Sequence, residues 1–263
     1  MALALGLMSG TSCDGVSAAL VEFSGRRFRV LAFQTSRYPA SLQRLLHRSR
    51  ELTTPGIAQL HVLLGALLAS SAAGLLRRAR VRPSGVAVIG SHGHTVYHGP
   101  QGSIPCTLQL GDPQVIAERT GVPVIADFRP RDVAAGGQGA PLVPAFDEHF
   151  FGRGQPVALQ NLGGIGNVTL VGQGISTVAF DTGPGNCLID LASRRITRGR
   201  HAYDPDGRLA RQGRVDQAAL RKLMRHPYLR QRPPKSTGPE LFNESLIQRV
   251  WGRRWTSRLP PIS

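Results

Sequence analysis

The chain contains little cysteine and almost no lysine. Its three cysteines, Cys13, Cys106 and Cys187, lie far apart and fit neither a disulfide framework nor a zinc-ligand spacing. Free cysteines of this kind are typical of a reducing compartment, so we expect a cytoplasmic protein. Only Lys222 and Lys235 are lysines among the 32 basic residues, and arginine therefore carries nearly all of the formal net charge of +16.

A strongly basic chain can bind nucleic acid, but the supporting motifs are missing here. Most of the positive excess lies after Leu191. The sequence contains no heptads, no aromatic ribonucleoprotein motif and no zinc-finger spacing. We therefore expect no nucleic-acid partner.

Signals for membranes and for common nucleotide motifs are also lacking. The most apolar stretch, Val62 to Leu76, is shorter than the roughly 20 residues of a spanning helix and favours a buried helix. The N-terminus has no basic region before its apolar residues, which argues against a signal peptide. No G-x-x-x-x-G-K-[ST] and no complete G-x-G-x-x-G occurs, which excludes a Walker-type loop.

A hydrophobic content of 41% and 31 glycines in 263 residues predict a folded α/β protein. Apolar runs and turn residues define the elements. The expected strands are 2–8, 16–23, 27–35, 85–90, 107–111, 122–126, 157–162, 167–171 and 176–180. The expected helices are 41–52, 56–80, 113–121, 143–151, one starting near residue 185, 216–225 and 240–250.

The first turn, Gly6 to Gly15, combines glycines, three hydroxyl side chains and one carboxylate between two apolar runs. Glycine lets successive N–H groups point at one spot, so this hairpin is suited to an anion such as a phosphate. Asp14 could orient a water molecule or a metal ion. An ordinary Gly/Ser hairpin turn remains the alternative.

Polar residues follow two of the expected buried strands. Ser91 to Thr95, with His92 and His94, follow the first, and Asp127 to Asp132 follow the second, before a glycine-rich loop. Open α/β sheets bind ligands at such strand ends. Ordinary loop histidines and a surface salt-bridge loop are the alternatives.

The second half repeats the pattern of strand, glycine turn, strand, strand and helix after a boundary near Gly152 to Pro156. Its third strand leads into Asp181-Thr182-Gly183-Pro184-Gly185-Asn186. A carboxylate beside a helix N-terminus, with glycines around it, predicts a catalytic or ligand-binding role for Asp181.

Taken in order, these segments resemble the bacterial anhydro-N-acetylmuramic acid kinases. The resemblance covers about residues 3 to 244. The segments that carry it are GLMSGTSCDG (6–15), SHGHT (91–95), LGD (110–112), ADFR (126–129), AGGQGAPLVP (135–144), NLGGIGN (161–167), FDTGPGN (180–186), PPKSTG (233–238) and ELFN (240–243).

The resemblance implies two RNase-H-like domains of the actin-like ATPase type with a central cleft, over residues 1–153 and 154–263. It implies ATP and Mg²⁺ as cofactors and an amino sugar as substrate: the 1,6-anhydro ring is opened and O6 is phosphorylated, giving N-acetylmuramic acid 6-phosphate in peptidoglycan recycling. The resemblance leaves open whether the protein forms a homodimer.

The resemblance also implies roles for individual residues. Asp181 would be the catalytic base, and Asp14 a metal ligand. ATP would contact Gly10, Thr11, Ser12, Cys13, Asp14, Gly15, Val16, Ser17, Gly163, Gly164, Gly166 and Asn167. The sugar would contact His92, Arg129, Asp132, Gly183, Pro184 and Gly185.

The sequence also departs from the family pattern. Cys13 and His94 stand where the family more often has a larger aliphatic residue and glutamine. After residue 250 the chain lacks the adenosine-binding part of the family, so we expect an incomplete second domain. The alternative function is therefore a catalytically impaired remnant that retains sugar or phosphate binding.

Overall fold

The computed structural model describes residues 1–10, 13, 15–100, 102–233, 235–238 and 240–252. The chain divides into two compact units, Met1–Leu142 and Val143–Ser263. Helix α5 (Val143–Phe151), at this division, contacts strand β8 (Ile165–Val171) of the second unit. The domain boundary after residue 153 stays a prediction.

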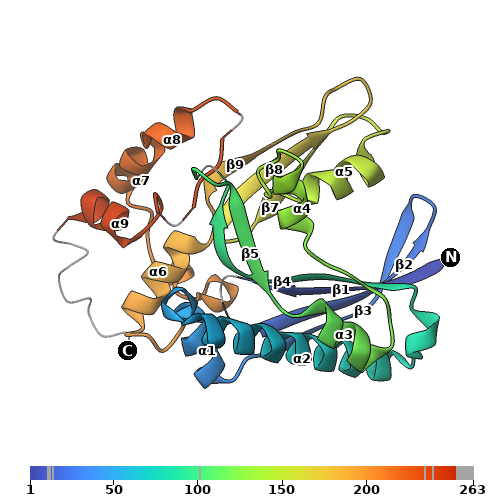
Figure 1. The fold of residues 1–263 in the computed structure, drawn as a ribbon. Coiled ribbons are helices and arrows are strands. Elements are labelled where there is room, and N and C mark those ends of the chain that lie inside the picture. Colours follow the sequence, from blue (N-terminus) through green and yellow to red (C-terminus); the bar gives the residue numbers. More distant parts are fainter. Residues whose placement is uncertain (11–12, 14, 101, 234, 239, 253–263) are drawn as a thin grey trace. The chain divides into compact units, whose positions relative to one another are not determined.

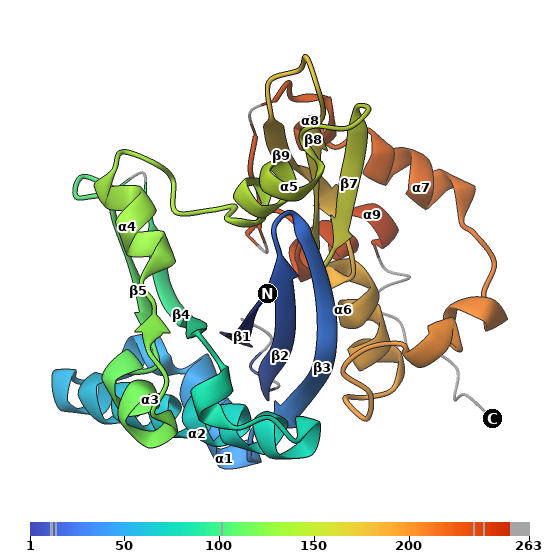
Figure 2. The same ribbon diagram turned by 90° about the vertical axis from the view of Figure 1, so that its right-hand side faces the viewer.

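Unit 1 contains a six-stranded sheet. Its path order is β3-β2-β1-β4-β5, and β6 pairs with the first part of β4. Figure 2 shows β1, β2 and β3 side by side. The strands are β1 (Ala2–Ser9), β2 (Gly15–Ser24), β3 (Arg27–Arg37), β4 (Val88–Gly99), β5 (Cys106–Leu110) and β6 (Val124–Ile125).

The strand directions in this sheet match an RNase-H-like domain. β2 is antiparallel to both β1 and β3, as the predicted hairpins require, whereas β4 is parallel to β1 and β6 is parallel to β4. A parallel pair needs a long crossover, and helices α1 (Ala40–His47) and α2 (Thr54–Ala79) between β3 and β4 supply it. The predicted α/β class and RNase-H-like fold are therefore confirmed.

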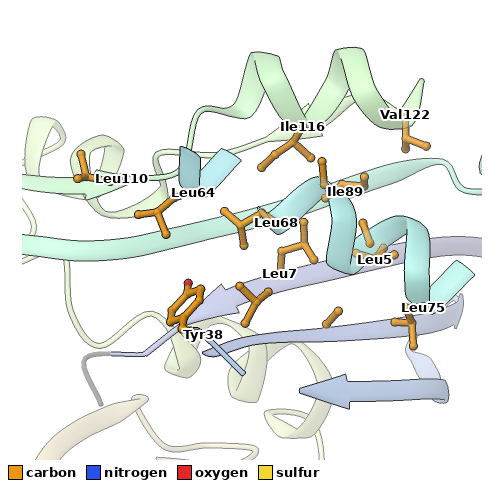
Figure 3. Packing of buried hydrophobic residues seen from close by; sticks show 14 of the residues in the cluster. Leu5, Leu7, Tyr38, Leu64, Leu68, Leu75, Ile89, Leu110, Ile116 and Val122 are labelled. Atoms are coloured by element: carbon orange, nitrogen blue, oxygen red, sulfur yellow. The ribbon is translucent and has the colours of Figure 1, made fainter. Parts of the chain in front are cut away.

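Helix α2 (Thr54–Ala79) packs along the sheet of unit 1 (Figure 1). Its Leu64, Leu68 and Leu75 face Leu5 and Leu7 of β1 in Figure 3, and each is at most 2% exposed. Burying a leucine side chain is worth about 1.5–3 kcal/mol, so this layer stabilises the unit. The other helical segments are α1 (Ala40–His47), η1 (Ser49–Glu51), η2 (Pro83–Gly85), α3 (Pro113–Thr120) and α4 (Phe128–Ala134).

Helix α2 agrees in length with the predicted helix 56–80 and extends beyond its most apolar stretch, Val62 to Leu76. The whole helix has 26 residues and is long and apolar enough to cross a membrane by length and composition. Half of its most apolar window is nevertheless buried inside the protein. The packing of its leucines on the sheet accounts for that apolar character, so α2 is a core helix.

Strand β4 differs from the predicted strand 85–90, because it begins at Val88 and continues to Gly99. His92 and His94 therefore lie inside a strand and not in a loop after one. The register against β1 shifts between Leu7 and Ser9, and Gly93 has a positive φ of 70°. This irregularity bends the strand where its polar residues occur.

The segment after β6 was expected to be a loop cluster, but Phe128–Ala134 forms helix α4. Pro130 lies in its first turn, where a missing N–H costs no helical hydrogen bond. The helix places Arg129 and Asp132 three residues apart, on neighbouring positions of one helix face.

Unit 2 contains a three-stranded antiparallel sheet of order β7-β8-β9. The predicted hairpin around Gly163 and Gly164 is confirmed, since β7 and β8 pair up to Leu162 and Gly166. The third strand extends beyond the predicted end at Phe180, so Asp181 lies inside it. The strands are β7 (Val157–Leu162), β8 (Ile165–Val171) and β9 (Val178–Pro184).

Helices follow the sheet of unit 2. The predicted helix 216–225 is observed as α7, and Asp216 caps it by accepting hydrogen bonds from the N–H groups of Ala218 and Ala219. Phe242 and Tyr228 are 2% exposed and form the centre of a second core. The helical segments are α6 (Cys187–Ile196), η3 (Pro205–Gly207), η4 (Ala210–Gln212), α7 (Gln217–Met224), α8 (Pro227–Arg230) and α9 (Glu244–Trp251).

Candidate functional site

In unit 1 the three side chains predicted to bind sugar belong to one hydrogen-bonded network. Arg129 Nε donates to His92 Nε2 over 2.8 Å, and Arg129 NH1 donates to the carbonyl of Gly139 over 2.7 Å. The N–H of Gly139 donates to Asp132 Oδ2 over 2.7 Å. Strand β4, helix α4 and the following glycine loop thus meet at one point.

The network defines the protonation of His92. A guanidinium group is always a donor, so Nε2 of His92 must accept and the proton lies on Nδ1, which is 3.0 Å from the carbonyl of Gly93. Burial, and to a smaller extent the charge of Arg129, lowers the pKa of His92. The imidazole is therefore neutral near neutral pH and keeps Arg129 in place without repelling it.

Arg129 is partly buried and has no carboxylate partner among the described residues, because both of its recorded partners are uncharged. Burial lowers the pKa of its guanidinium group. A cation that is partly removed from water and lacks a counter-ion binds a carboxylate or phosphate strongly. The network is therefore suited to an anionic substituent of a small molecule.

The first glycine turn is anchored beside this network. Ser9 Oγ lies 2.8 Å from His94 Nδ1, and Cys13 Sγ lies 3.8 Å from His94 Nε2. Cys13 and His94, the two departures from the family pattern, therefore contact each other. The backbone closes the turn through a hydrogen bond from the N–H of Cys13 to the carbonyl of Gly10.

The other phosphate-turn predictions have different outcomes in the structure. Val16 is buried in the core, and the hydroxyl of Ser17 lies 3.2 Å from that of Thr35. Contacts outside the turn therefore position both side chains. A side chain at Gly15 would collide with the carbonyl of Ser36. Thr11, Ser12 and Asp14 lie outside the described residues, and their roles stay predictions.

In unit 2, Asp181 is held by uncharged partners. Its Oδ2 accepts a hydrogen bond from the N–H of Thr237 over 2.9 Å, and its carbonyl accepts one from the hydroxyl of Tyr228 over 2.7 Å. Burial raises the pKa of the Asp181 carboxyl, the Thr237 N–H opposes this, and the charge of Glu240 adds to it. A carboxylate with a raised pKa and one oriented oxygen has the properties of a general base.

The phenol of Tyr228 is affected by the same burial and by the charge of Asp181. Burial, together with the charge of Asp181, raises the pKa of its phenol to about 12. Lys235 does not neutralise Asp181, since its ammonium group donates to the carbonyls of Tyr228 and Leu229. Asp181 therefore has no cationic partner among the residues that the structure describes.

The second glycine turn packs against the start of helix α6. The N–H groups of Gly185 and Cys187 donate to the carbonyl of Gly164, and that of Asn186 donates to the carbonyl of Gly163. A side chain on Gly185 would collide with the carbonyl of Gly163. These N–H groups, of which only that of Gly185 belongs to a residue predicted to contact a ligand, are thus satisfied within the protein, and Gly185 has a packing role.

The remaining predicted residues of this unit lie in strands. Gly166 and Asn167 belong to β8, and the carbonyl of Asn167 accepts a hydrogen bond from the side chain of Gln160. Gly183 and Pro184 end β9, and a side chain on Gly183 would press on Leu229. Their ligand roles stay predictions.

The described residues differ in how well they would accept a metal ion and ATP. Within the described ranges, no three His, Cys, Asp or Glu side chains are grouped so as to hold a metal ion. The turn at Gly163 and Gly164 has open space, because a side chain there would meet no atom closer than 3.6 Å. That turn therefore lets a phosphate approach the backbone, whereas no metal ligand set is identified.

Sequence reasoning gave no role to the residues that position Asp181. Thr237 and Tyr228 are 56 and 47 residues away from it along the chain, and Lys235, whose carbonyl accepts a hydrogen bond from the N–H of Asp181, is 54 residues away. The segment Pro233 to Gly238 carried part of the family resemblance, and this was the available signal. Only folding brings the backbone N–H of Thr237, in this segment, to the carboxylate of Asp181.

Comparisons with known proteins identify the family of the chain. A family model described as "Anhydro-N-acetylmuramic acid kinase" matches residues 2–256. The chain is 43% identical over 266 aligned positions to the anhydro-N-acetylmuramic acid kinase of Caldanaerobacter subterraneus, covering 94% of this chain and 67% of that protein. It is 44% identical to the enzyme of that name from Vibrio vulnificus, covering 97% of this chain and 70% of that protein. The chain thus spans about two thirds of the length of these relatives.

Among solved structures, a Ppx/GppA family member from Aquifex aeolicus is similar over 75% of this chain and 60% of its own. It is 9% identical, with a TM-score of 0.35. That likeness is too weak to support any statement about function, and the strand order of unit 1 remains the basis for the fold.

Proposed function

Because the chain belongs to the anhydro-N-acetylmuramic acid kinase family, we propose that it is a kinase that opens the ring of 1,6-anhydro-N-acetylmuramic acid and phosphorylates O6. The products are N-acetylmuramic acid 6-phosphate and ADP. The observation that carries this proposal is Asp181, a carboxylate with a raised pKa, one oriented oxygen and no cationic partner among the described residues.

In the proposed reaction Asp181 accepts a proton from the water molecule that attacks the anomeric carbon. The bond from that carbon to O6 breaks, and O6 attacks the γ-phosphorus as the bond to the bridging oxygen of ADP breaks. The N–H of Thr237 keeps one carboxylate oxygen in a fixed direction, so the other oxygen is available to the water. The raised pKa makes Asp181 a stronger base than an ordinary carboxylate.

Sugar binding is proposed for the network of His92, Arg129 and Asp132. The lactyl carboxylate of the sugar would pair with the guanidinium group of Arg129, which lacks another anion among the described residues. Neutral His92 and the carbonyl of Gly139 hold that group in place, and Asp132 holds Gly139. A pre-positioned cation of this kind favours binding of carboxylate sugars over neutral ones.

Bound Mg²⁺–ATP would supply the γ-phosphoryl group and neutralise its charge. The two glycine turns, Gly10 to Gly15 and Gly163 to Asn167, are the proposed phosphate contacts, with Asp14 as a metal ligand. A cytoplasmic location and a homodimer are further parts of the proposal. No observation favours the impaired remnant as a second function.

The test is a coupled assay of ADP release from this chain with ATP and Mg²⁺, with and without the anhydro sugar. We expect ADP release that depends on the sugar. Mass analysis should find a product heavier than the sugar by one phosphoryl group and one water molecule. Sugar-independent ADP release, or phosphorylation without addition of water, would reject the proposed reaction.

A further inference from the structure

Lys235 lies in the segment that brings the N–H of Thr237 to Asp181, and the proposed function leaves its side chain without a role. Its carbonyl accepts a hydrogen bond from the N–H of Asp181 over 3.0 Å. Two residues further along, the N–H of Thr237 donates to the carboxylate of Asp181 over 2.9 Å. Residues 235–237 are therefore bonded to both the backbone and the side chain of Asp181.

The ammonium group of Lys235 joins this segment to helix α8 (Pro227–Arg230). Its Nζ donates to the carbonyl of Tyr228 over 3.2 Å and to that of Leu229 over 3.5 Å. The last carbonyls of a helix have no partner within the helix, and a lysine near its C-terminus can bond them and complement the helix dipole. The side chain of Lys235 thus bonds the end of α8 while its backbone bonds β9.

An aromatic ring from the core of unit 2 lies beneath the same ammonium group. Nζ is 4.7 Å from the ring centroid of Tyr228, a distance typical of a cation–π contact. The ring of Phe242 meets that of Tyr228 edge-on, with centroids 5.7 Å apart. Both rings are 2% exposed and belong to one hydrophobic cluster, so the cation rests on a rigid surface.

These contacts form a closed ring of bonds around Asp181. The hydroxyl of Tyr228 donates to the carbonyl of Asp181 over 2.7 Å, and the N–H of Asp181 donates to the carbonyl of Lys235. The ammonium group of Lys235, bonded to the carbonyl of Tyr228, completes the ring. Two residues of chain span at most about 7 Å, so the position of Lys235 limits where the N–H of Thr237 can lie.

The recorded partners of the Lys235 ammonium group are uncharged, so its role differs from that of a counter-ion. The other titratable groups recorded around Asp181 are the phenol of Tyr228 and the carboxylate of Glu240. Glu240 raises the pKa of Asp181, whereas the N–H of Thr237 lowers it. Loss of the Thr237 bond therefore changes that pKa in the opposite direction to loss of the Glu240 charge.

We propose that Lys235 is a positioning residue for the base: its ammonium group ties the segment of Thr237 to α8 and so holds the carboxylate of Asp181 in its working orientation. The inference rests on the proposed function and adds to it the group that orients the base. Because Lys235 acts through Asp181, turnover depends on it and sugar affinity does not.

The test compares the two lysines of the full chain. Lys235→Met keeps an unbranched side chain and removes the ammonium group. At saturating sugar, kcat should fall about 10- to 100-fold, the effect of a misplaced catalytic group, while the KM for sugar stays near the parent value. The acid limb of the pH profile of kcat should move to higher pH, because loss of the Thr237 bond raises the pKa of Asp181.

Lys222→Met is the matched control. Nζ of Lys222 donates to the carbonyl of Val250 over 3.4 Å, near the end of helix α9 in the same unit. This is the same type of contact, but it is made to a helix that does not bond Asp181 in the described chain. The variant should keep the kcat and the acid limb of the parent.

Hydrogen exchange of the Thr237 amide separates positioning from charge. This amide should exchange faster in Lys235→Met than in the parent, because its hydrogen bond is weakened. Lys235→Arg keeps a cation with several donors and should restore slow exchange and most of the lost kcat. Unchanged exchange with a shifted acid limb would show that Lys235 acts through its charge alone. Parent-like kcat and exchange in Lys235→Met would show that the ammonium group is dispensable, and either result overturns the inference.

A second variant covers a folding failure of the first. Lys235→Gln shortens the side chain and removes its charge but keeps a polar end, and the same directions of change are expected. Parent-like kcat and exchange in a folded Lys235→Gln chain would also overturn the inference. If the parent shows no sugar-dependent ADP release, the proposed function fails. Thr237 exchange and an NMR titration of the Asp181 carboxyl then still show whether Lys235 orients that group, so the two failures are distinguishable.

Discussion

The candidate sites of the two units hold charges of opposite sign by the same means. In unit 1 a guanidinium group, Arg129, is held by a neutral imidazole and a backbone carbonyl. In unit 2 a carboxylate, Asp181, is held by a backbone N–H. Neither charge has a counter-ion among the described residues, so each is fixed in place without being neutralised. Perturbed groups of this kind are typical of functional sites.

The difference between the sites is chemical. Arg129 stays protonated at any relevant pH, so unit 1 provides a permanent charge for binding. Asp181 has a raised pKa and can exchange a proton, so unit 2 provides a base for turnover. Affinity and turnover should therefore respond to changes in different units.

The largest effect is expected for Asp181→Asn. Asparagine keeps the oxygen that accepts from the N–H of Thr237 but cannot take up a proton. Turnover, measured by coupled ADP release, should fall by about 10²- to 10⁴-fold, as for loss of a general base. Sugar affinity should change little.

Asp190→Asn is the matched control for this prediction. Asp190 lies on α6 of the same unit, and burial raises its pKa as well, but it lies outside β9. Its variant should retain near-parent turnover. Near-parent turnover in Asp181→Asn would instead assign the base to another carboxylate, with Asp14 the next candidate.

The second effect is on affinity. Arg129→Lys keeps the positive charge but loses the planar group that bonds His92 and Gly139 together. Loss of a charge-assisted hydrogen bond is worth about 1.5–3 kcal/mol, which corresponds to about 10- to 150-fold weaker binding of the carboxylate sugar. Arg131→Lys, an exposed arginine on the same helix, is the control and should bind as the parent does. Equal affinity of Arg129→Lys and the parent would remove Arg129 from the sugar site.

The pattern of the sequence predicted the elements of these sites better than their internal contacts. The two glycine hairpins were predicted because apolar runs flank glycine-rich turns, and the strands do pair across both turns. Asp181 was identified from its place beside glycines at a strand end, and Arg129 and His92 from the resemblance. These are local signals.

What the sequence did not predict depends on contacts between distant segments. Strand β4 was expected to end before His92, because its continuation depends on pairing with β5. Helix α4 was missed because Asp127 to Asp132 was interpreted as a polar cluster between a strand and a glycine loop, although Pro130 is tolerated in a first helical turn. The N–H of Thr237 has no side-chain signature in the sequence, since any residue can donate from its backbone.

A smaller effect concerns the pH dependence of turnover. The base must be ionised, so activity should fall as the pH drops through the pKa of Asp181. Because that pKa is raised, the fall should begin above the range of an ordinary aspartate, about 3.9. Glu240→Gln removes a charge that raises the pKa, so its acid limb should move to lower pH. An unmoved acid limb would show that another group controls this part of the profile.

The smallest effect is expected on the stability of unit 1. Burial lowers the pKa of both His92 and His94. Such groups take up protons more readily in the unfolded chain, so stability is fully present above about pH 6.5 and is lost as the pH falls. Urea unfolding at several pH values should show this loss, and His92→Gln should reduce it. A chain that is equally stable at low pH would contradict the neutral, hydrogen-bonded imidazole.

The most direct test of the division between the units is one crossed measurement. Sugar affinity by calorimetry and turnover at saturating sugar are determined together for the parent, Asp181→Asn and Arg129→Lys. We predict that Asp181→Asn loses turnover and keeps its affinity, whereas Arg129→Lys loses affinity and keeps most of its turnover at saturation. If both variants lose affinity and turnover in the same proportion, binding and proton transfer are not divided between these residues, and the account is wrong.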